Sequence, residues 1–341
     1  MIEELDKRHI PSLLSRKEML DILLKEEYGF LPPPPTYIQF EVKKNIIPNF
    51  CAGNATCDKV TAHCKLGNKD FSFDFNAILP TDNEKHPFFV HVNFRPDIPD
   101  RHQPTEEIID NGFAILSFCY EDVTKDDGDF TDGLAGVLYE NGERSGSDAG
   151  KIAMWAWAAH RIMDYAETLS DRLDLNCAVM CGHSRLGKTA LLAAATDERF
   201  SFAYSNDSGC SGAAITRGKQ GETVEAIYKK FPFWFCENYK KYVDDFECMP
   251  FDQHYLIASI APRKVLIGSA VEDIWADPYS EQLACFGASS AFECGFICPD
   301  RQALVGEKFF EGHLGYHLRK GLHYFSREDW NKLIEFVNLH K

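Results

Sequence analysis

The sequence lacks several features that would each point to a class of function. No uninterrupted apolar run reaches the about 18 residues that a membrane-spanning helix needs, so we expect no membrane partner. Cations are scarce: 36 Lys and Arg stand against 52 Asp and Glu, for a net charge of −16. Nucleic-acid binding needs clustered cations, so we expect no nucleic-acid partner. An acidic substrate would have to be attracted by cations within the site itself.

Signals for export and for metal binding are also missing. The first seven residues are charged and contain no apolar run of the kind found in secretory signals. Twelve cysteines are present, but Cys119, Cys177 and Cys181 lie in apolar stretches, where a free thiol behaves as a small hydrophobe. No two cysteine pairs have zinc-finger spacing. We therefore expect reduced thiols, a cytoplasmic location, and no metal or other cofactor.

Apolar patterns along the chain predict an α/β fold with a mostly parallel sheet. A helix over 15–27 and alternating strands over 38–42, 59–66 and 70–79 predict an antiparallel beginning, at about 15–80. After that, strands over 86–94, 112–120, 176–181, 202–205 and 264–270 alternate with helices over 153–168, 189–195 and 326–339. Such alternation places helices on both faces of a parallel sheet.

The stretches that interrupt the alternation of strands and helices indicate how the chain is organised. No internal repeat, low-complexity tract or linker is present, so we expect one domain over 1–341. Residues 121–144 form a long polar stretch that predicts a loop at the mouth of a site. Residues 209–249 are longer than one crossover requires and are rich in aromatic residues, which predicts an insertion that shapes a substrate cleft.

The stretch 182–189 (GHSRLGKT) fits two incompatible motifs. It matches the phosphate loop of NTPases, G-x-x-x-x-G-K-[ST], and it resembles the turn that presents the nucleophile of serine hydrolases. Both motifs need a strand before the turn and a helix after it. A phosphate-loop enzyme also needs an acidic residue on another strand for magnesium, and Asp207 is a weak candidate. A serine hydrolase needs an acid and a histidine downstream, and both are present, which favours Ser184 as a nucleophile.

A serine hydroxyl needs an adjacent base, and the base in turn needs an acid that orients it. Three histidines could be the base, namely His313, His317 and His323. Position favours His323, because it comes after the last predicted strand and just before the terminal helix. The acid has two candidates: Asp273 follows the strand at 264–270, and Asp207 follows the strand at 202–205. We expect Asp273 to be the main acid and Asp207 an auxiliary.

Several segments, which occur in the same order along the chain, resemble those of one family, the glucuronoyl esterases, and in particular its bacterial members. The segments are 182–188 (GHSRLGK), 205–214 (SNDSGCSGAA), 221–224 (GETV), 231–235 (FPFWF), 250–254 (PFDQH), 272–278 (EDIWADP) and 315–321 (GYHLRKG). The resemblance runs from about residue 17 to the C-terminus. It implies an α/β-hydrolase three-layer sandwich. In fungal members a cysteine directly precedes the serine, whereas this chain has His183 there.

The resemblance also implies roles for four further residues. The backbone N–H of Arg185 would be an oxyanion donor, and its side chain would assist. Lys188, Glu222 and Trp275 match positions that hold the uronic sugar in relatives. The resemblance thus predicts a serine esterase that acts on a glucuronate-ester oligosaccharide, as in links between lignin and glucuronoxylan. The alternatives are an acetylxylan-type or other carbohydrate esterase, a catalytically silent carbohydrate binder and, more distantly, the phosphate-loop NTPase.

Overall fold

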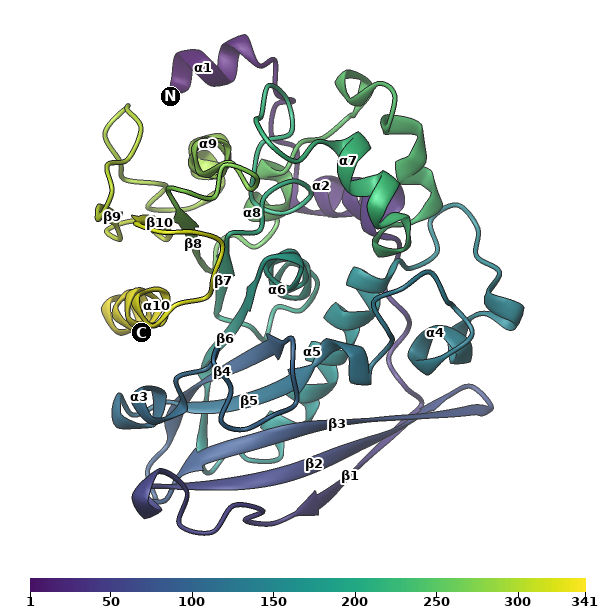
Figure 1. Cartoon of the computed structure of the whole chain (residues 1–341), viewed down its shortest axis with the longest axis vertical. Coiled ribbons are helices and arrows are strands. Elements are labelled where there is room, and N and C mark those ends of the chain that lie inside the picture. Colours follow the sequence, from purple (N-terminus) through teal and green to yellow (C-terminus); the bar gives the residue numbers. More distant parts are fainter.

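The computed structural model of the chain describes residues 1–341, and all ten strands lie in one mixed sheet. The strand order is β1-β2-β3-β5-β4-β6-β7-β8-β10-β9, and the six strands from β5 to β10 in this order are mutually parallel. The first three strands are antiparallel along one edge and β9 is antiparallel at the other (Figure 1). The strands are β1 Tyr37–Lys43, β2 Ala55–Leu66, β3 Lys69–Pro80, β4 His86–Asn93, β5 Ala114–Cys119, β6 Leu173–His183, β7 Phe202–Asn206, β8 Lys264–Ala270, β9 Lys308–Phe309 and β10 Leu314–Arg319.

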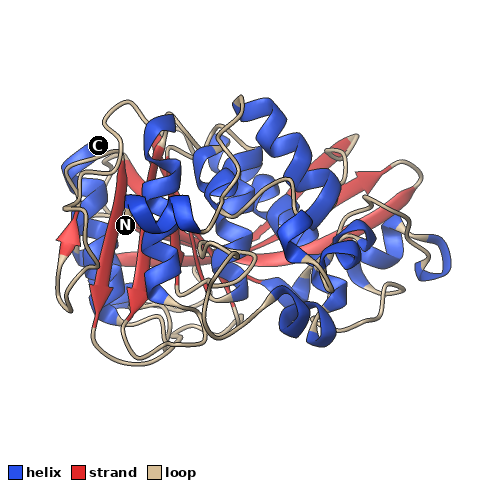
Figure 2. Ribbon diagram, turned by 90° about the horizontal axis from the view of Figure 1, so that it is seen from above, coloured by secondary structure: helices blue, strands red, loops and turns tan.

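Helices cover both faces of this sheet (Figure 2). The helices are α1 Ile2–Lys7, α2 Arg16–Leu23, α3 Thr105–Asp110, α4 Gly133–Leu138, α5 Lys151–Glu167, α6 Arg185–Thr196, α7 Val224–Lys230, α8 His254–Ala258, α9 Pro278–Ala288 and α10 Arg327–His340. In the view of Figure 1, α3 and α10 lie to the left of the central strands, while α5 and α6 lie to the right. No helix is both long enough and apolar enough to cross a membrane.

Strand β6 shows how the sequence separates the two cores. Successive side chains of a strand point to opposite faces. Cys177, Val179 and Cys181 belong to the core that α3 and α10 cover. Ala178 and Met180, the residues between them, belong to the larger core under α5 and α6. A continuous apolar run is therefore needed here, because both faces of the strand are buried.

The predicted elements agree with this architecture, with two corrections. The α/β class, the antiparallel first strands and every predicted strand are confirmed within a few residues, and Ser326 caps α10 through a capping box with Asp329, as predicted. The predicted helix over 15–27 is α-helical only to Leu23, and a π-helical turn, Leu24–Tyr28, follows it. The loop predicted over 121–144 contains the short helix α4 and two 3₁₀ turns.

The π-helical turn carries buried polar groups that anchor the segment 209–249. Tyr28 donates its hydroxyl to the Ser211 carbonyl (2.8 Å), and the Cys236 N–H donates to the Glu27 carbonyl (2.9 Å). The Glu27 carboxyl is fully buried and accepts from the side-chain amide of Gln253, at 3.0 and 3.2 Å. Burial raises the pKa of Glu27 from 4.5 to about 8.

This raised pKa predicts a stability that falls as the pH rises. Below about pH 4.5 the side chain is protonated in both states. Between that pH and about 8 the unfolded chain releases the proton while the folded chain retains it, so stability is lost over this window. We expect Glu27→Gln, which cannot ionise, to raise the melting temperature at pH 9. The increase should correspond to about a few kcal/mol in the free energy of unfolding. At pH 5, near the start of this window, the variant should gain much less.

The control is Glu26→Gln. This change removes an ion pair with Lys241 and an acceptor for the Tyr242 hydroxyl, so it should lower the melting temperature at both pH values. Thermal unfolding followed by circular dichroism gives the comparison. Equal shifts for Glu27→Gln at pH 5 and pH 9 would contradict the ionisation argument.

Candidate active site

The turn between β6 and α6 holds Ser184 in a strained backbone conformation. Its φ is 59° and its ψ is −128°, a region that residues other than glycine rarely adopt. The Ser184 N–H donates to the Asn206 carbonyl at the end of β7 (2.8 Å). A Cβ placed on Gly182 would lie 2.2 Å from the Leu186 carbonyl oxygen, so the two sides of the turn touch. This is the geometry of a nucleophile turn.

The usual nucleophile turn, G-x-S-x-G, has its second glycine two residues after the serine, whereas in this chain the glycine comes one residue later, at Gly187, for a packing reason. Leu186 is fully buried in the core, where a glycine would leave a void. A Cβ at Gly187 would lie 2.8 Å from Ser205 Oγ and 3.0 Å from Ser208 Cβ. The helix therefore approaches β7 most closely at Gly187, which explains the departure from the usual spacing.

A cavity of about 360 Å³ opens above this turn. All eight residues predicted from the sequence line it, although they come from five separate segments of the chain: Ser184, Arg185, Lys188, Asp207, Glu222, Asp273, Trp275 and His323. Other lining residues were not predicted individually, among them Lys230, Phe231 and Trp234. The aromatic segment 231–235 could have indicated the last two, because it lies in the predicted cleft insertion.

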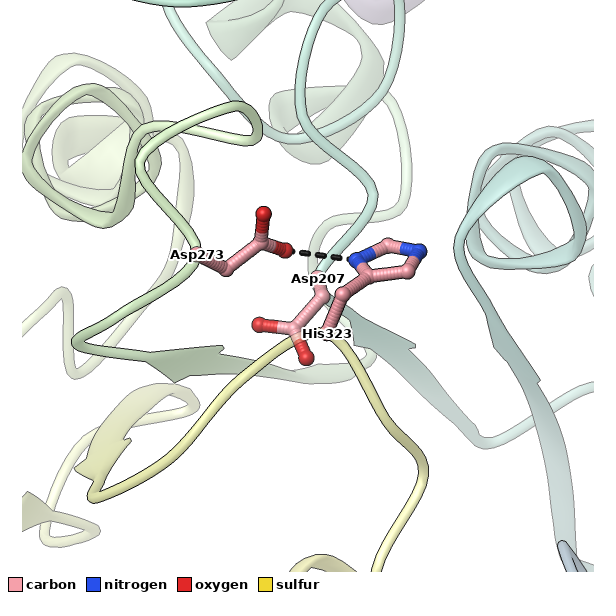
Figure 3. Close-up of side chains that lie close together, drawn as sticks. All are labelled: Asp207, Asp273 and His323. Atoms are coloured by element: carbon pink, nitrogen blue, oxygen red, sulfur yellow. Dashed lines mark hydrogen bonds and ion pairs between the residues drawn. The ribbon is translucent and has the colours of Figure 1, made fainter.

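His323 and Asp273 form a hydrogen-bonded pair at one side of the cavity (Figure 3). His323 Nδ1 lies 2.5 Å from Asp273 Oδ2, and the carboxyl is buried. The imidazole side chain is 45% exposed, and its Nε2 points away from Asp273. A carboxylate at Nδ1 fixes the tautomer that leaves Nε2 free to accept a proton. No hydrogen bond within 3.5 Å joins His323 to the Ser184 hydroxyl.

Asp207 lies beside this pair but is bonded elsewhere (Figure 3). Its Oδ1 accepts the Ala270 N–H at the end of β8 (2.7 Å), and its Oδ2 accepts from Arg319 Nη2 (3.2 Å). Burial raises the pKa of Asp207 well above its ordinary value. Asp207 lies near the His323 imidazole, but no hydrogen bond joins the two side chains.

The two other histidines lie outside the cavity. His317 is buried within β10, and its Nε2 lies 3.0 Å from the Tyr204 hydroxyl. Burial lowers the pKa of His317 to about 3, so the ring is neutral. His313 precedes β10 at the opposite end of that strand from His323. Of the three candidate bases, His323 is therefore the one that lines the cavity together with Ser184.

The Arg185 side chain is held by an acidic and an aromatic neighbour. Its Nη1 forms an ion pair with Asp126, and Trp234 Nε1 donates to the other oxygen of that carboxylate (2.6 Å). The guanidinium carbon lies 4.8 Å from the centre of the Trp234 ring, and Nε has no partner. Asp126 is a site residue that the sequence did not reveal, because 59 residues separate it from Arg185.

Lys188, Glu222 and Trp275 also line the cavity. The Lys188 ammonium donates to the carbonyls of Ser208 and Cys210, and burial lowers its pKa. Its Nζ lies 4.0 Å from Glu222 Oε2. The Glu222 N–H donates to the Trp275 carbonyl (3.0 Å), which ties the insertion to the segment after Asp273. The Trp275 side chain stands 59% exposed at the rim.

One group of side chains has the spacing of a metal site. Ligand atoms of Asp207, Asp273 and His323 all lie within 4.8 Å of one another. Asp207 is already bonded to the cationic Arg319, and Asp273 to the imidazole. These bonds engage the atoms that a metal would need, so the donor set fits a hydrogen-bonded acid–base pair better than a metal centre.

A mostly parallel sheet with a strained serine between a central strand and its helix defines an α/β hydrolase. The family model for fungal glucuronyl esterases matches residues 62–294 of the chain. The chain therefore belongs to the glucuronoyl esterase family, and the nucleotide-binding interpretation of 182–189 is wrong.

Individual relatives support this assignment. The carbohydrate esterase MZ0003 of an unknown prokaryotic organism is 40% identical over 239 residues, which are 69% of this chain and 55% of that protein. The 4-O-methyl-glucuronoyl methylesterase of Schizophyllum commune is 26% identical over 81% of this chain and 66% of its own length. The glucuronoyl esterase structure from Solibacter usitatus is 32% identical with a TM-score of 0.86, and the match covers 95% of this chain and 91% of that one. The chain thus matches about half to two thirds of the length of these curated relatives.

The tight turn at Gly182 gives a testable prediction. Gly182→Ala places a Cβ against the Leu186 backbone, which cannot move without distorting α6. We expect the variant to lose at least about 2 kcal/mol of stability, as measured by chemical denaturation. Gly128→Ala is the matched control, because a Cβ there has only the Phe233 ring within 4 Å, at 3.9 Å. Equal stabilities of the two variants would contradict the close contact.

Proposed function

We propose that the chain is a serine esterase that hydrolyses esters formed on the carboxyl of (4-O-methyl-)D-glucuronic acid. The observation that carries this proposal is the His323–Asp273 pair, which shares one cavity with a strained Ser184 and with the predicted sugar-binding residues. Family membership supports the same class of reaction. The natural substrate would be a glucuronate-ester oligosaccharide, such as a link between lignin and glucuronoxylan.

The chemistry proceeds through an acyl-enzyme. Ser184 Oγ attacks the ester carbonyl while His323 Nε2 accepts the hydroxyl proton, and Asp273 stabilises the imidazolium that forms. The imidazolium then protonates the departing alcohol, and water attacks the acyl-enzyme with His323 again as the base. The Arg185 N–H at the start of α6 and the Arg185 guanidinium stabilise the oxyanion. These steps require no metal or organic cofactor.

The polar wall of the cavity suits a uronic sugar. Lys188 uses two N–H groups on the carbonyls of Ser208 and Cys210, so one N–H remains for a sugar oxygen. Glu222 offers a carboxylate that accepts from sugar hydroxyls, and Trp275 offers an exposed ring at the rim. An acetyl ester presents no sugar on the acid side of the bond. A xylan deacetylase would instead meet its sugar on the alcohol side of the ester.

The predicted cytoplasmic location is part of the proposal and rests on thiol chemistry. All twelve cysteines are free, and eight of them are buried. Free thiols persist in reducing compartments. Fractionation of the native host, with an antibody against the chain, tests this location, and recovery outside the cell would contradict it.

Hydrolysis of benzyl glucuronate, compared with that of an acetylated xylo-oligosaccharide, tests the proposed activity. We expect the glucuronate ester to have a kcat/KM at least about a hundredfold higher, because a site built to hydrogen-bond a substrate strongly rejects analogues that lack those groups. A preference for the acetyl ester would favour the acetylxylan-type alternative. Binding of the uronate without turnover of either ester would identify a silent carbohydrate binder.

The roles of Ser184 and His323 give the next prediction. Ser184→Ala and His323→Ala should each fold normally and lose at least about 10⁴-fold in kcat, because each removes a member of one catalytic unit. The double variant should be no worse than either single variant. His317→Gln is the control, because that side chain lies outside the cavity, and its kcat should stay near wild type. Residual activity above about a thousandth in Ser184→Ala would contradict the assignment.

The two acids should contribute unequally. Asp273 bonds His323 directly, whereas Asp207 bonds Arg319 and the β8 backbone. Asp273→Ala should therefore lower kcat by roughly 10–100-fold, less than the 10⁴ known for an isolated triad, because the loop that carries His323 keeps its own hydrogen bonds. Asp207→Ala should lower kcat less than Asp273→Ala does, and the double variant should lower kcat most. Normal activity of Asp273→Ala beside an inactive Asp207→Ala would reverse this hierarchy.

A further inference from the structure

Arg319, the last residue of β10, is a buried cation that lies four residues before His323. Its residue is only 4% exposed. Nε donates to both oxygens of Asp329 (2.9 and 2.7 Å), and Nη2 donates to Asp207 Oδ2 (3.2 Å). The remaining N–H groups donate to three carbonyls of the following loop, those of Lys320, Leu322 and Tyr324. Every donor of the guanidinium is therefore engaged.

Two of these carbonyls flank His323 directly. Nη1 lies 3.2 Å from the Leu322 carbonyl, and Nη2 donates to that of Tyr324. The Leu322 side chain is exposed and gives the loop little packing, whereas the Tyr324 ring packs on His102, with 4.9 Å between ring centres, and its hydroxyl donates to the Arg101 carbonyl (3.3 Å). Within the loop, the Gly321 carbonyl accepts from the Glu272 N–H (3.0 Å), but neither carbonyl beside His323 has a backbone partner. The guanidinium thus supplies the bonds that hold the backbone on both sides of His323.

Two buried carboxylates in turn fix the guanidinium. Asp329 belongs to the first turn of α10, where it also completes the capping box with Ser326. Asp207 lies at the end of β7, and its other oxygen accepts the Ala270 N–H, three residues before Asp273. A continuous chain of bonds therefore runs from the strand that carries the acid, through Asp207 and Arg319, to the loop that carries the base.

We propose that Arg319 is a positioning residue that sets the place of His323 relative to Asp273 and Ser184, and that Asp207 acts through Arg319 rather than on the imidazole. The inference rests on the proposed esterase mechanism. A flat guanidinium can reach carbonyls on both sides of His323 while it contacts two carboxylates, whereas an ammonium has three donors and a shorter reach. Small displacements of a catalytic group reduce turnover strongly, of the order of 10²-fold for about 1 Å.

The test compares Arg319→Lys with wild type on benzyl glucuronate. Lysine keeps the positive charge between Asp207 and Asp329, so the variant should fold. We expect kcat to fall at least about tenfold while KM changes less than about threefold, because the Arg319 side chain bonds none of the predicted sugar-binding residues, Lys188, Glu222 and Trp275. A kcat within twofold of wild type would overturn the proposal. So would a loss confined to KM.

Arg217→Lys is a matched control for the burial of an arginine. Arg217 is also 4% exposed, forms an ion pair with Asp252 (3.1 Å) and donates to the carbonyls of Phe251 and Met249, but it does not line the cavity. If Arg319 contributed only to stability, Arg319→Lys and Arg217→Lys would both lower the melting temperature and would both leave kcat unchanged. We expect only the Arg319 variant to lose kcat. An equal loss in both would overturn the positioning role.

A double-variant cycle tests the path through Arg319. If Asp207 acts only by holding Arg319, Asp207→Asn and Arg319→Lys together should be no worse than the more damaging single variant. If Asp207 instead acts directly on His323, the two losses multiply, and the second half of the proposal fails. The same cycle with Asp273→Asn should give multiplied losses, because Asp273 acts on the imidazole itself.

Two measurements separate this proposal from the substrate assignment. The rate at which a fluorophosphonate labels Ser184 depends on the base but not on the natural substrate, and Arg319→Lys should slow it at least about tenfold. The low-field NMR resonance of the His323 Nδ1 proton should broaden or vanish in the folded variant. Wild-type labelling without glucuronate hydrolysis would refute the proposed substrate alone. Unchanged labelling and an unchanged resonance would refute the role of Arg319.

Discussion

The parallel register of four neighbouring strands is the constraint on which the site depends. His183 of β6 pairs with Asn206 of β7, Asn206 pairs with Gly268 of β8, and Ala270 of β8 pairs with Arg319 of β10. The four strands therefore end at one edge of the sheet. The residues Ser184, Asp207, Asp273 and His323 each follow within four positions of such an end. A shift of one strand by a single residue would turn its side chains to the opposite face and dismantle the cavity.

Much of this arrangement could be predicted because it is local in sequence. The apolar run of β8 and the capping box at Ser326 specify their elements within one residue, and Ser184 is identified by its flanks. The order of the elements then places the acid and the base, because parallel strands align their ends. Even the unusual position of Gly187 follows from contacts with β7, although only the structure shows which contacts these are.

The parts that could not be predicted are contacts between segments distant in the chain. Asp126 stands in a polar loop with several other aspartates, and nothing local indicates which of them meets Arg185. Arg319 ends a strand, where an arginine would ordinarily be solvated. Its burial between Asp207 and Asp329 depends on tertiary contacts, which the local sequence does not indicate. The π-helical turn at Leu24–Tyr28 is similar, because helix propensity favours continuing α2 and the contacts of Glu27 and Tyr28 prevail.

The uneven burial of the five tryptophans has an optical consequence. Trp155, Trp157 and Trp330 are sealed in the two cores, at most 1% exposed, and Trp234 is buried beneath Arg185. Trp275 alone stands in water, at the rim of the cavity. The red-shifted part of the intrinsic emission therefore comes from one indole beside the site. A quencher such as iodide reaches that indole first, and a sugar that covers it would shield it, so occupancy of the cavity can be followed without any added dye.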